Sequence, residues 1–204
     1  MKNAEAGVNI DVNTVVKENR KTRYTKKALR ESIIELMKSK AITHITIKEI
    51  CGLADISRST FYAYYNNQYD LLKRIEDETT AYIEDILKKL DKNRSMNEIV
   101  NIIEDLMQYI SCNNNSIQVL LSENGDINFQ KRFFQRYQRY LINYFVEKLE
   151  DNPEINSEIM EYHSAYIING SIALVQHWLK NNMDLPIPKI AKLLIQLSSV
   201  FVGP

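Results

Sequence analysis

The sequence predicts an all-α fold of about nine helices, and three observations indicate it. Only five glycines and four prolines occur in 204 residues, and three of the prolines fall in the last nineteen, so few residues interrupt a helix. Apolar residues recur at the three- and four-residue spacing of a helix face. Thr46 with Glu49, and Ser95 with Glu98, have the spacing of capping boxes, which mark helix starts.

The first third of the chain predicts a mobile tail over residues 1–21 and then three helices. From Tyr24, one helix face carries apolar residues at i, i+4, i+7 and i+8, and this helix should end near residues 39–41. A second helix follows Thr46, and its buried stripe holds Cys51 as a core residue rather than a reactive thiol. Ser57 is a good N-cap for a third helix.

The joint between the second and third helices has its own signature. Ile56 and Phe61 have the spacing of a hydrophobic staple, which fixes the angle at which the chain enters a helix. Two short helices joined by a turn of about three residues are typical of a helix-turn-helix.

The rest of the chain continues the helical pattern. A long helix begins near Asn67, where Asp70 forms a cap-like pair, and runs to Leu90. The polar segment Asp91–Ser95 is the predicted domain junction. Further helices are expected from Ser95 to Ile110, to about Ser122, and over 129–149, 154–182 and 188–201. The predicted divisions are a tail (1–21), a helix-turn-helix domain (22–66), a connecting helix (67–91) and a second domain (92–204).

The formal net charge of zero hides two oppositely charged parts. Residues 1–75 carry 14 Lys and Arg against 8 Asp and Glu, whereas residues 76–204 carry 12 against 18. The positive part is a candidate for binding a polyanion, although a solvated basic tail gives the same asymmetry.

Other classes of protein receive little support. No apolar run reaches the roughly 18 residues of a membrane span, and the N-terminus lacks the apolar core of a signal peptide. Two cysteines 61 positions apart are not a disulfide framework. The expectation is a soluble, cytoplasmic protein without a membrane partner.

The helix after Ser57 predicts two faces. Phe61 and Tyr65 are spaced i, i+4 on the side of Ile56 and should face the core, which leaves polar and aromatic groups outward around Arg58, the sole charge of this helix. Such a helix suits the major groove of double-stranded DNA, where Arg, Ser and Thr contact base edges and Tyr contacts phosphates. The starts of the flanking helices could bind phosphates through free amides. The DNA-binding candidates are Thr46, Lys48, Arg58, Ser59, Thr60, Tyr62, Tyr64, Asn67 and Gln68. Half-buried packing of the tyrosines is the alternative.

The segment TIKEICGLADISRSTFYAYYNNQYDLL resembles the helix-turn-helix and the start of the fourth helix in the TetR family of bacterial transcriptional regulators. The resemblance covers roughly residues 24–90 and implies DNA contacts at the candidate positions other than Asn67. Three positions depart from the family pattern: Asp55 and Ala41 stand where the family usually has glycine, and Gln68 stands where a phosphate-binding lysine is common.

The segments YIINGSIALVQHWLKNN and PKIAKLLIQL resemble the C-terminal region of a TetR subset that includes regulators of dihydroxyacetone kinase operons. This resemblance implies a domain that binds an unknown small-molecule effector and forms a homodimer. The last two helices are apolar over wide faces, so a symmetric four-helix dimer interface is expected. Gly170, in mid-helix, predicts a close helix approach. A twofold dimer could present two reading helices about 34–36 Å apart, which matches a palindromic operator.

Aromatic and histidine residues of the second domain are candidates for lining an effector pocket, although aromatic stripes at helical spacing more often form core. They are Tyr109, Phe133, Tyr137, Tyr140, Tyr144, His163, Tyr166 and His177.

No cofactor, metal or enzyme is predicted, because the three His, the two Cys and the absence of a Gly-rich loop match no catalytic spacing, and Cys112 with the later His residues lacks the spacing of a zinc site. The main interpretation is a ligand-responsive repressor. The alternatives are an activator or co-activator that works with a partner protein, and a helical adaptor that binds no DNA.

Overall fold

The computed structural model describes residues 19–90, 93–149 and 157–199. Within these ranges the chain forms nine α-helices and one short 3-10 helix, and no strand. The predicted all-α fold is therefore confirmed. The helices are α1 (Arg20–Met37), η1 (Ile42–His44), α2 (Ile47–Ala54), α3 (Arg58–Tyr62), α4 (Gln68–Leu87), α5 (Met96–Cys112), α6 (Asn114–Leu120), α7 (Ile127–Leu149), α8 (Ser157–Lys180) and α9 (Ile187–Ser199).

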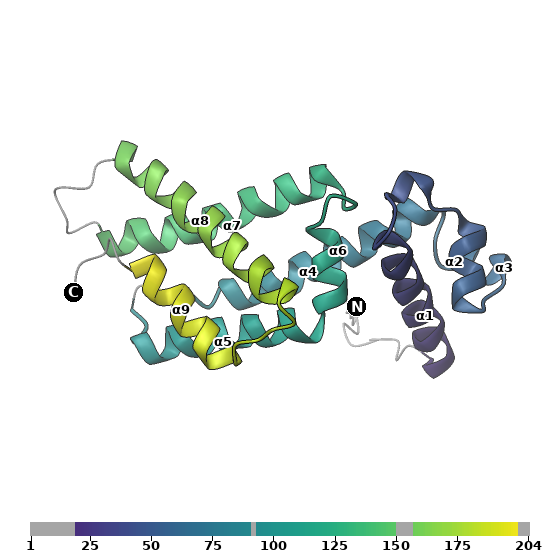
Figure 1. Cartoon of the computed structure of the whole chain (residues 1–204), viewed down its shortest axis with the longest axis horizontal. Helices are drawn as coiled ribbons and strands as arrows, with labels where there is room; N and C mark the ends of the chain where they lie inside the picture. The colour runs from purple at the N-terminus through teal and green to yellow at the C-terminus, as the bar shows by residue number, and fades with distance from the viewer. Residues whose placement is uncertain (1–18, 91–92, 150–156, 200–204) are drawn as a thin grey trace, which may run out of the picture.

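The helices α1 to α3, with η1, form one end of an elongated molecule (Figure 1) and are called the head below. The capping box predicted at Thr46 and Glu49 opens α2, and Ser57 caps α3. Between them Asp55 adopts the left-handed conformation, with φ 52° and ψ 47°. Asp is one of the few residues that tolerate this backbone, so the chain turns here without the usual glycine.

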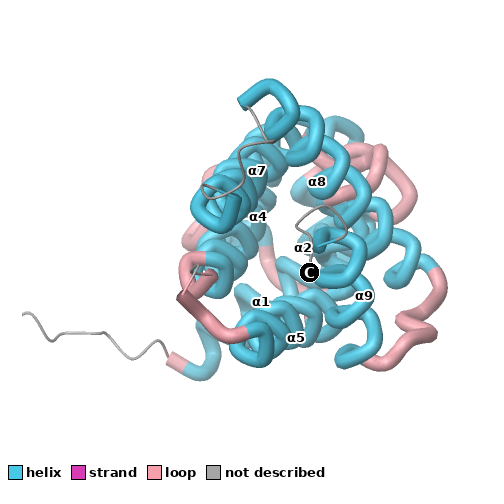
Figure 2. Tube along the Cα trace, turned by 90° about the vertical axis from the view of Figure 1, so that its left-hand side faces the viewer, coloured by secondary structure: helices cyan, strands magenta, loops and turns pink. Residues whose placement is uncertain are grey.

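The helices α4 to α9 form the rest of the molecule and are called the bundle. Figure 2, which looks along the molecule, shows α4, α5, α9, α8 and α7 following one another around a ring. Each neighbouring pair in this order is in contact, including α7 with α4, so the ring is closed. The short α6 packs against α1, α5 and α8 and therefore joins the bundle to the head.

The hydrophobic core of the head continues into the bundle. Fully buried Leu29, Ile50 and Phe61 of the head belong to the same cluster as Leu120 of α6 and Phe129 of α7. A second cluster lies at the other side of the bundle, around Trp178 of α8 and Ile190 of α9. Because the first cluster crosses between the two parts, a displacement of α6 or α7 disturbs the packing of the head.

Several boundaries differ from the predicted ones. The helix α1 begins at Arg20, four residues before Tyr24, because the side chain of Asn19 accepts a hydrogen bond from the backbone of Lys21 and caps it there. Thus Arg20 and Lys21 belong to a helix, whereas the rest of the predicted tail, up to residue 18, lies outside the described residues. The predicted extensions to residue 154 and to Phe201 also lie outside them, as do residues 91 and 92 of the predicted junction.

Two expectations about glycine positions are settled by the backbone. Ala41 is extended, with φ −64° and ψ 152°, so no glycine is needed after α1. Gly170 is exposed and a Cβ added to it would meet nothing within 4 Å, so the predicted close helix approach at Gly170 is wrong within one chain.

Candidate nucleic-acid interface

The start of α3 is built from three hydroxyl groups. The Oγ of Ser57 accepts a hydrogen bond from the backbone N–H of Thr60 at 3.1 Å and so caps the helix. The same Oγ lies 2.9 Å from the Oγ of Ser59 and 2.8 Å from the Oγ1 of Thr60. The cluster fixes the first turn of α3 and leaves hydroxyl groups at its outer end.

The inner face of α3 fastens it to the head, as predicted. Phe61 is fully buried and Tyr65 is nearly so, and their ring centroids lie 5.7 Å apart. Ile56 packs partly buried against the same core. These contacts fix the direction in which the opposite face points.

The outer face of α3 carries exposed Arg58, Ser59 and Tyr62, and Tyr62 is 57% exposed. An exposed ring of this size, beside a cation and hydroxyl groups, is available to a partner rather than to the core. The ring of Tyr62 stands edge-on to Phe61, with centroids 5.7 Å apart, which holds it in place. Thr60 is half-buried because of its contact with Ser57.

Tyr64 differs from the outward position expected for it. The helix α3 ends at Tyr62 with Ala63 as its C-cap, so Tyr64 lies beyond the end of the helix. Tyr64 is half-buried against the head core, its hydroxyl donates to Thr22 Oγ1 at 3.4 Å, and Lys26 Nζ lies 5.6 Å from its ring centroid. Its ring therefore joins the end of α3 to α1, which is the packing alternative noted for the tyrosines.

The start of α2 presents Thr46 and Lys48, both exposed. The carboxylate of Glu49 accepts from the backbone N–H and the hydroxyl of Thr46, each at 2.8 Å, and forms an ion pair with Lys40. The hydrogen bond from Lys40, followed by those from Thr46, lowers the pKa of Glu49 to about 2. The amide of Thr46 is thus already occupied, and only the first amides inside the helix, those of Ile47 and Lys48, point out of its end.

The start of α4 repeats this arrangement. The Oδ1 of Asn67 accepts from the backbone N–H of Asp70 at 2.9 Å, and the carboxylate of Asp70 accepts from the backbone and side chain of Asn66, both at 3.0 Å. Gln68, half-buried, is the first residue of the helix. The predicted candidates therefore lie at the starts of α2 and α4 and along α3, apart from Tyr64, which follows the end of α3.

Sequence reasoning assigned the first basic residues of α1 to a tail and missed them as candidates. Arg20, Lys21 and Arg23 are exposed on the first turn of a defined helix, and Lys27 follows one turn later. The signal that could have found them is the run of six basic residues between Lys17 and Lys27.

Only some of the residues predicted to line an effector pocket lie near one another in the structure. Tyr109 of α5 stacks on Tyr82 of α4, with centroids 4.0 Å apart, and Tyr137 of α7 meets Phe133 edge-on at 4.3 Å. The hydroxyl of Tyr137 is buried and has no hydrogen-bond partner within the described residues, and burial raises the pKa of this group well above its usual range.

The remaining candidates are more scattered. Tyr166 is 65% exposed on α8, and His177 is exposed beside Asn181, whose Nδ2 lies 2.9 Å from its Nε2. Both therefore belong to the surface of the chain. His163 is half-buried, and burial lowers its pKa. Tyr140 is half-buried on α7, and the side chain of Tyr144 lies outside the described part.

Similarity to known proteins decides the family. A TetR-type family described as "Transcriptional regulator C-terminal region" matches residues 97–199, about half of the chain. The chain belongs to the TetR family of transcriptional regulators. The likeness found in the C-terminal segments and the helix-turn-helix is thereby confirmed at the level of the family.

One sequence relative of this TetR-family regulator matches about a third of the chain. It is the "Uncharacterized HTH-type transcriptional regulator YxbF" of Bacillus subtilis (strain 168), 33% identical over 64 residues, or 31% of this chain. The match spans only 15% of the length of that relative.

Solved structures share the fold over nearly the whole chain. The "Dihydroxyacetone kinase operon activator DhaS" is 20% identical, with a TM-score of 0.56 over 87% of this chain and 96% of its own. The fatty acid degradation regulator FadR from Bacillus halodurans is 13% identical, with a TM-score of 0.65 over 91% and 97%. FadR from Bacillus subtilis, in complex with stearoyl-CoA, is 15% identical, with a TM-score of 0.63 over 87% and 97%. At such identities the likeness shows the fold alone.

The described residues offer neither a metal-binding cluster nor a membrane-spanning helix. No group of three or more His, Cys, Asp or Glu side chains there is placed to hold a metal ion. Nor does any helix among them have the length and apolar character needed to cross a membrane.

Proposed function

We propose that this TetR-family regulator binds a palindromic operator as a homodimer in the cytoplasm, represses transcription there, and is released by a small effector rather than catalysing a reaction. The observation that carries the DNA-binding part is the outer face of α3, where Arg58, Ser59 and Tyr62 are exposed beside a buried Phe61. A helix with one cation, hydroxyl groups and a tyrosine fits the major groove and contacts both base edges and phosphates.

The flanking helix starts support the same orientation. Thr46 and Lys48 at α2, and Asn67 and Gln68 at α4, would contact phosphates on either side of the groove through side chains and the outermost amides. The first turn of α1 adds exposed Arg20, Lys21 and Arg23 to the positive surface. These phosphate contacts position the head, whereas α3 reads the bases.

An exposed apolar stripe on α8 supports the dimer. Tyr162 is 74% exposed and Tyr166 is 65% exposed, and exposed Gly170 follows at the same four-residue spacing. On α9, Leu197 is also largely exposed. A large apolar stripe with a glycine at its end is suited to a close approach by the same helices of a second chain.

Activation is a second candidate for the sign of regulation, because the structural relative DhaS is called an activator of its operon. An effector would act in either case by favouring one placement of the two heads over another. Among the predicted pocket residues, Tyr109, Phe133 and Tyr137 are the ones that face neighbouring rings inside the bundle.

The test is operator binding by the full chain, with the operator obtained by selection from random DNA. Arg58→Ala and Tyr62→Ala should each weaken specific binding by roughly ten- to hundredfold, because each removes a base or phosphate contact. Lys88→Ala removes an exposed cation at the C-cap of α4, at the end of the helix away from the head, and should leave binding unchanged. The logarithm of the binding constant should fall linearly with the logarithm of salt concentration. If Arg58→Ala and Tyr62→Ala bound the DNA as tightly as wild type and Lys88→Ala do, the result would instead favour a helical adaptor that binds no DNA.

A further inference from the structure

A cleft lies where the head meets the bundle, and its most unusual lining residue is Glu76. The cleft has a volume of about 1110 Å³ and is walled by α4, by α7, by the turn before α7 (124–126) and by residues 41–43 of the head. This volume slightly exceeds the roughly 300–1,000 Å³ that is typical of small-molecule sites. Among the predicted pocket aromatics its lining includes only Phe133, whose ring also contacts Tyr137.

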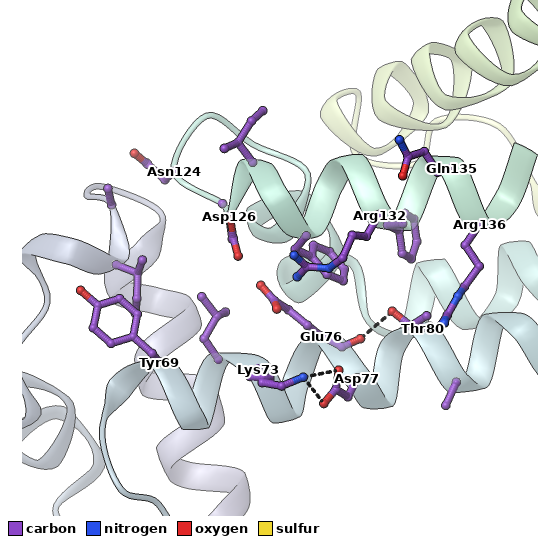
Figure 3. A pocket seen from close by; sticks show the side chains of 18 of the residues that line it. Tyr69, Lys73, Glu76, Asp77, Thr80, Asn124, Asp126, Arg132, Gln135 and Arg136 are labelled. Carbon is purple, nitrogen blue, oxygen red and sulfur yellow. Dashed lines mark hydrogen bonds and ion pairs between the residues drawn. The ribbon is translucent and has the colours of Figure 1, made fainter.

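Glu76 is 5% exposed, yet its Oε1 atom is buried without a hydrogen-bond partner within the described residues. Figure 3 shows its side chain leaving α4 toward α7, with Asp126 and Arg132 nearby. A buried carboxylate oxygen that lacks a donor is costly, and a native protein keeps one where another molecule can supply the donor.

The other charges of the cleft are largely balanced among themselves. Lys73 pairs with Asp77 at 2.9 Å, and Arg136 pairs with Glu84 at 2.9 Å. Glu76, Asp126 and Arg132 remain, which leaves one excess negative charge. Arg132 is exposed, while the Oδ1 of Asp126 accepts from the backbone of Asn128 at the start of α7.

The raised pKa of Glu76 agrees with a buried environment in which negative charge outweighs positive charge. Burial, and next the charge of Asp126, raise this pKa to about 7, against a smaller opposite effect of Arg132. A positive group beside Glu76 would remove this penalty. Phe129, Phe133 and Tyr69 line the same cleft, and aromatic faces attract cations.

We propose that the junction cleft is an effector site for a small organic cation with a primary ammonium or guanidinium group, which donates hydrogen bonds to Glu76. Such a group supplies both the missing donor and the missing charge, and charge-assisted hydrogen bonds of this kind are strong. An anionic or neutral ligand would leave the excess negative charge in place.

The walls of the cleft explain how occupancy would reach the head. The Nδ2 of Asn124, on the α7 side, donates to the backbone carbonyl of Lys38 at the end of α1, at 3.4 Å. Arg30 of α1 forms an ion pair with Glu78 of α4. A ligand between α4 and the turn 124–126 would separate two elements that both hold α1. This regulatory step rests on the proposed DNA-binding function, whereas ligand binding itself does not.

The experiment measures binding of agmatine and putrescine to the full chain by calorimetry at pH 8, without DNA, with 1,4-butanediol and succinate as neutral and anionic probes. Saturable binding of at least one of the two amines and none of the other probes is expected. Glu76→Gln should weaken amine binding by at least about tenfold. Asp85→Asn, which removes the same charge from an exposed residue of α4 that pairs with Lys88 outside the cleft, should change amine binding by less than about threefold.

Arg132→Gln provides a second variant at an exposed position. Because Arg132 competes with the ligand for Glu76, its removal should tighten amine binding several-fold. Absence of amine binding, equal binding by Glu76→Gln, or weaker binding by Arg132→Gln would overturn the proposal. Operator affinity with and without saturating amine then tests the coupling. Amine binding with unchanged operator affinity would refute the effector role, whereas failure of the DNA-binding proposal would appear as loss of specific operator binding without any amine.

Discussion

The head and the bundle of this regulator differ in how fully their polar groups are hydrogen-bonded. In the head, the starts of α2 and α3 are closed by side-chain caps, and the carboxylate of Glu49 is bound from three directions by Lys40 and Thr46. In the bundle, the Oε1 of Glu76 and the hydroxyl of Tyr137 are buried without a partner in the described part of the chain. Satisfied groups stabilise the fold of the head, whereas unsatisfied buried groups reduce the stability of the bundle, as expected for the ligand site proposed above.

Phe61→Ala should disrupt the core of the head and cause the largest loss of stability among the substitutions considered. The ring is fully buried at the centre of a core that also includes α6 and α7, so its loss should lower the free energy of unfolding by about 3–5 kcal/mol. Chemical denaturation followed by circular dichroism measures it. Tyr62→Ala, the adjacent and exposed residue, should cost no more than about 1 kcal/mol. Similar losses for both variants would contradict the two-faced assignment of α3.

The head could be predicted from sequence because its structure is determined locally. The capping box at Thr46 and Glu49, the cap at Ser57 and the inward face of Phe61 and Tyr65 follow from residues three or four positions apart, and the structure confirms each. The capping box that opens α5 of the bundle is local in the same way and is also confirmed. Tyr64 was not predictable in this way. Its position depends on α3 ending at Tyr62 and on contact with Thr22 and Lys26, some forty residues away in sequence.

The cleft at Glu76 was missed because it depends on long-range contacts. Glu76 and Thr79 lie on the buried side of α4 between Leu72 and Ile83, so a carboxylate on an apolar face was the available signal. The sequence does not show that residues 124–133 and 41–43 meet this face. For the same reason, spacing alone could not separate Tyr109 and Tyr137, which meet other rings, from the exposed Tyr166 and His177.

Glu76→Gln tests whether the buried carboxylate lowers the stability of the bundle, because it should change how stability depends on pH. The folded-state pKa of Glu76 is raised from about 4.5 to about 7, so between these values the folded chain holds a proton that the unfolded chain has released. Wild-type stability should therefore fall as pH rises from 4.5 to 7, by roughly 2–3 kcal/mol, and this part should then stay constant. Glu76→Gln lacks the titrating carboxyl group, so its stability should not show this fall. The variant should therefore be more stable than wild type at pH 8 but not at pH 4.5.

Denaturation midpoints across this pH range measure the difference between the two proteins. Asp85→Asn is the matched control and should keep the wild-type slope, because the exposed Asp85 pairs with Lys88 at the end of α4, outside the cleft. Parallel profiles for wild type and Glu76→Gln would show that the buried carboxylate does not reduce the stability of the bundle.

Asp55→Gly should give the smallest effect, and it tests the one strained position of the head turn. Asp55 holds φ at 52°, a conformation that glycine adopts without a steric penalty, so the substitution should raise the free energy of unfolding by about 0.5–1 kcal/mol. Asp55→Ala should lower it by a similar or larger amount, since alanine lacks the polar side chain that makes this backbone tolerable for Asp. Opposite signs for the two substitutions would show that the backbone conformation, and not a contact of the carboxylate, sets the stability of this turn. If both substitutions lowered stability equally, the carboxylate itself would be the stabilising group, and the head would then depend on a side-chain interaction where its backbone geometry indicates none.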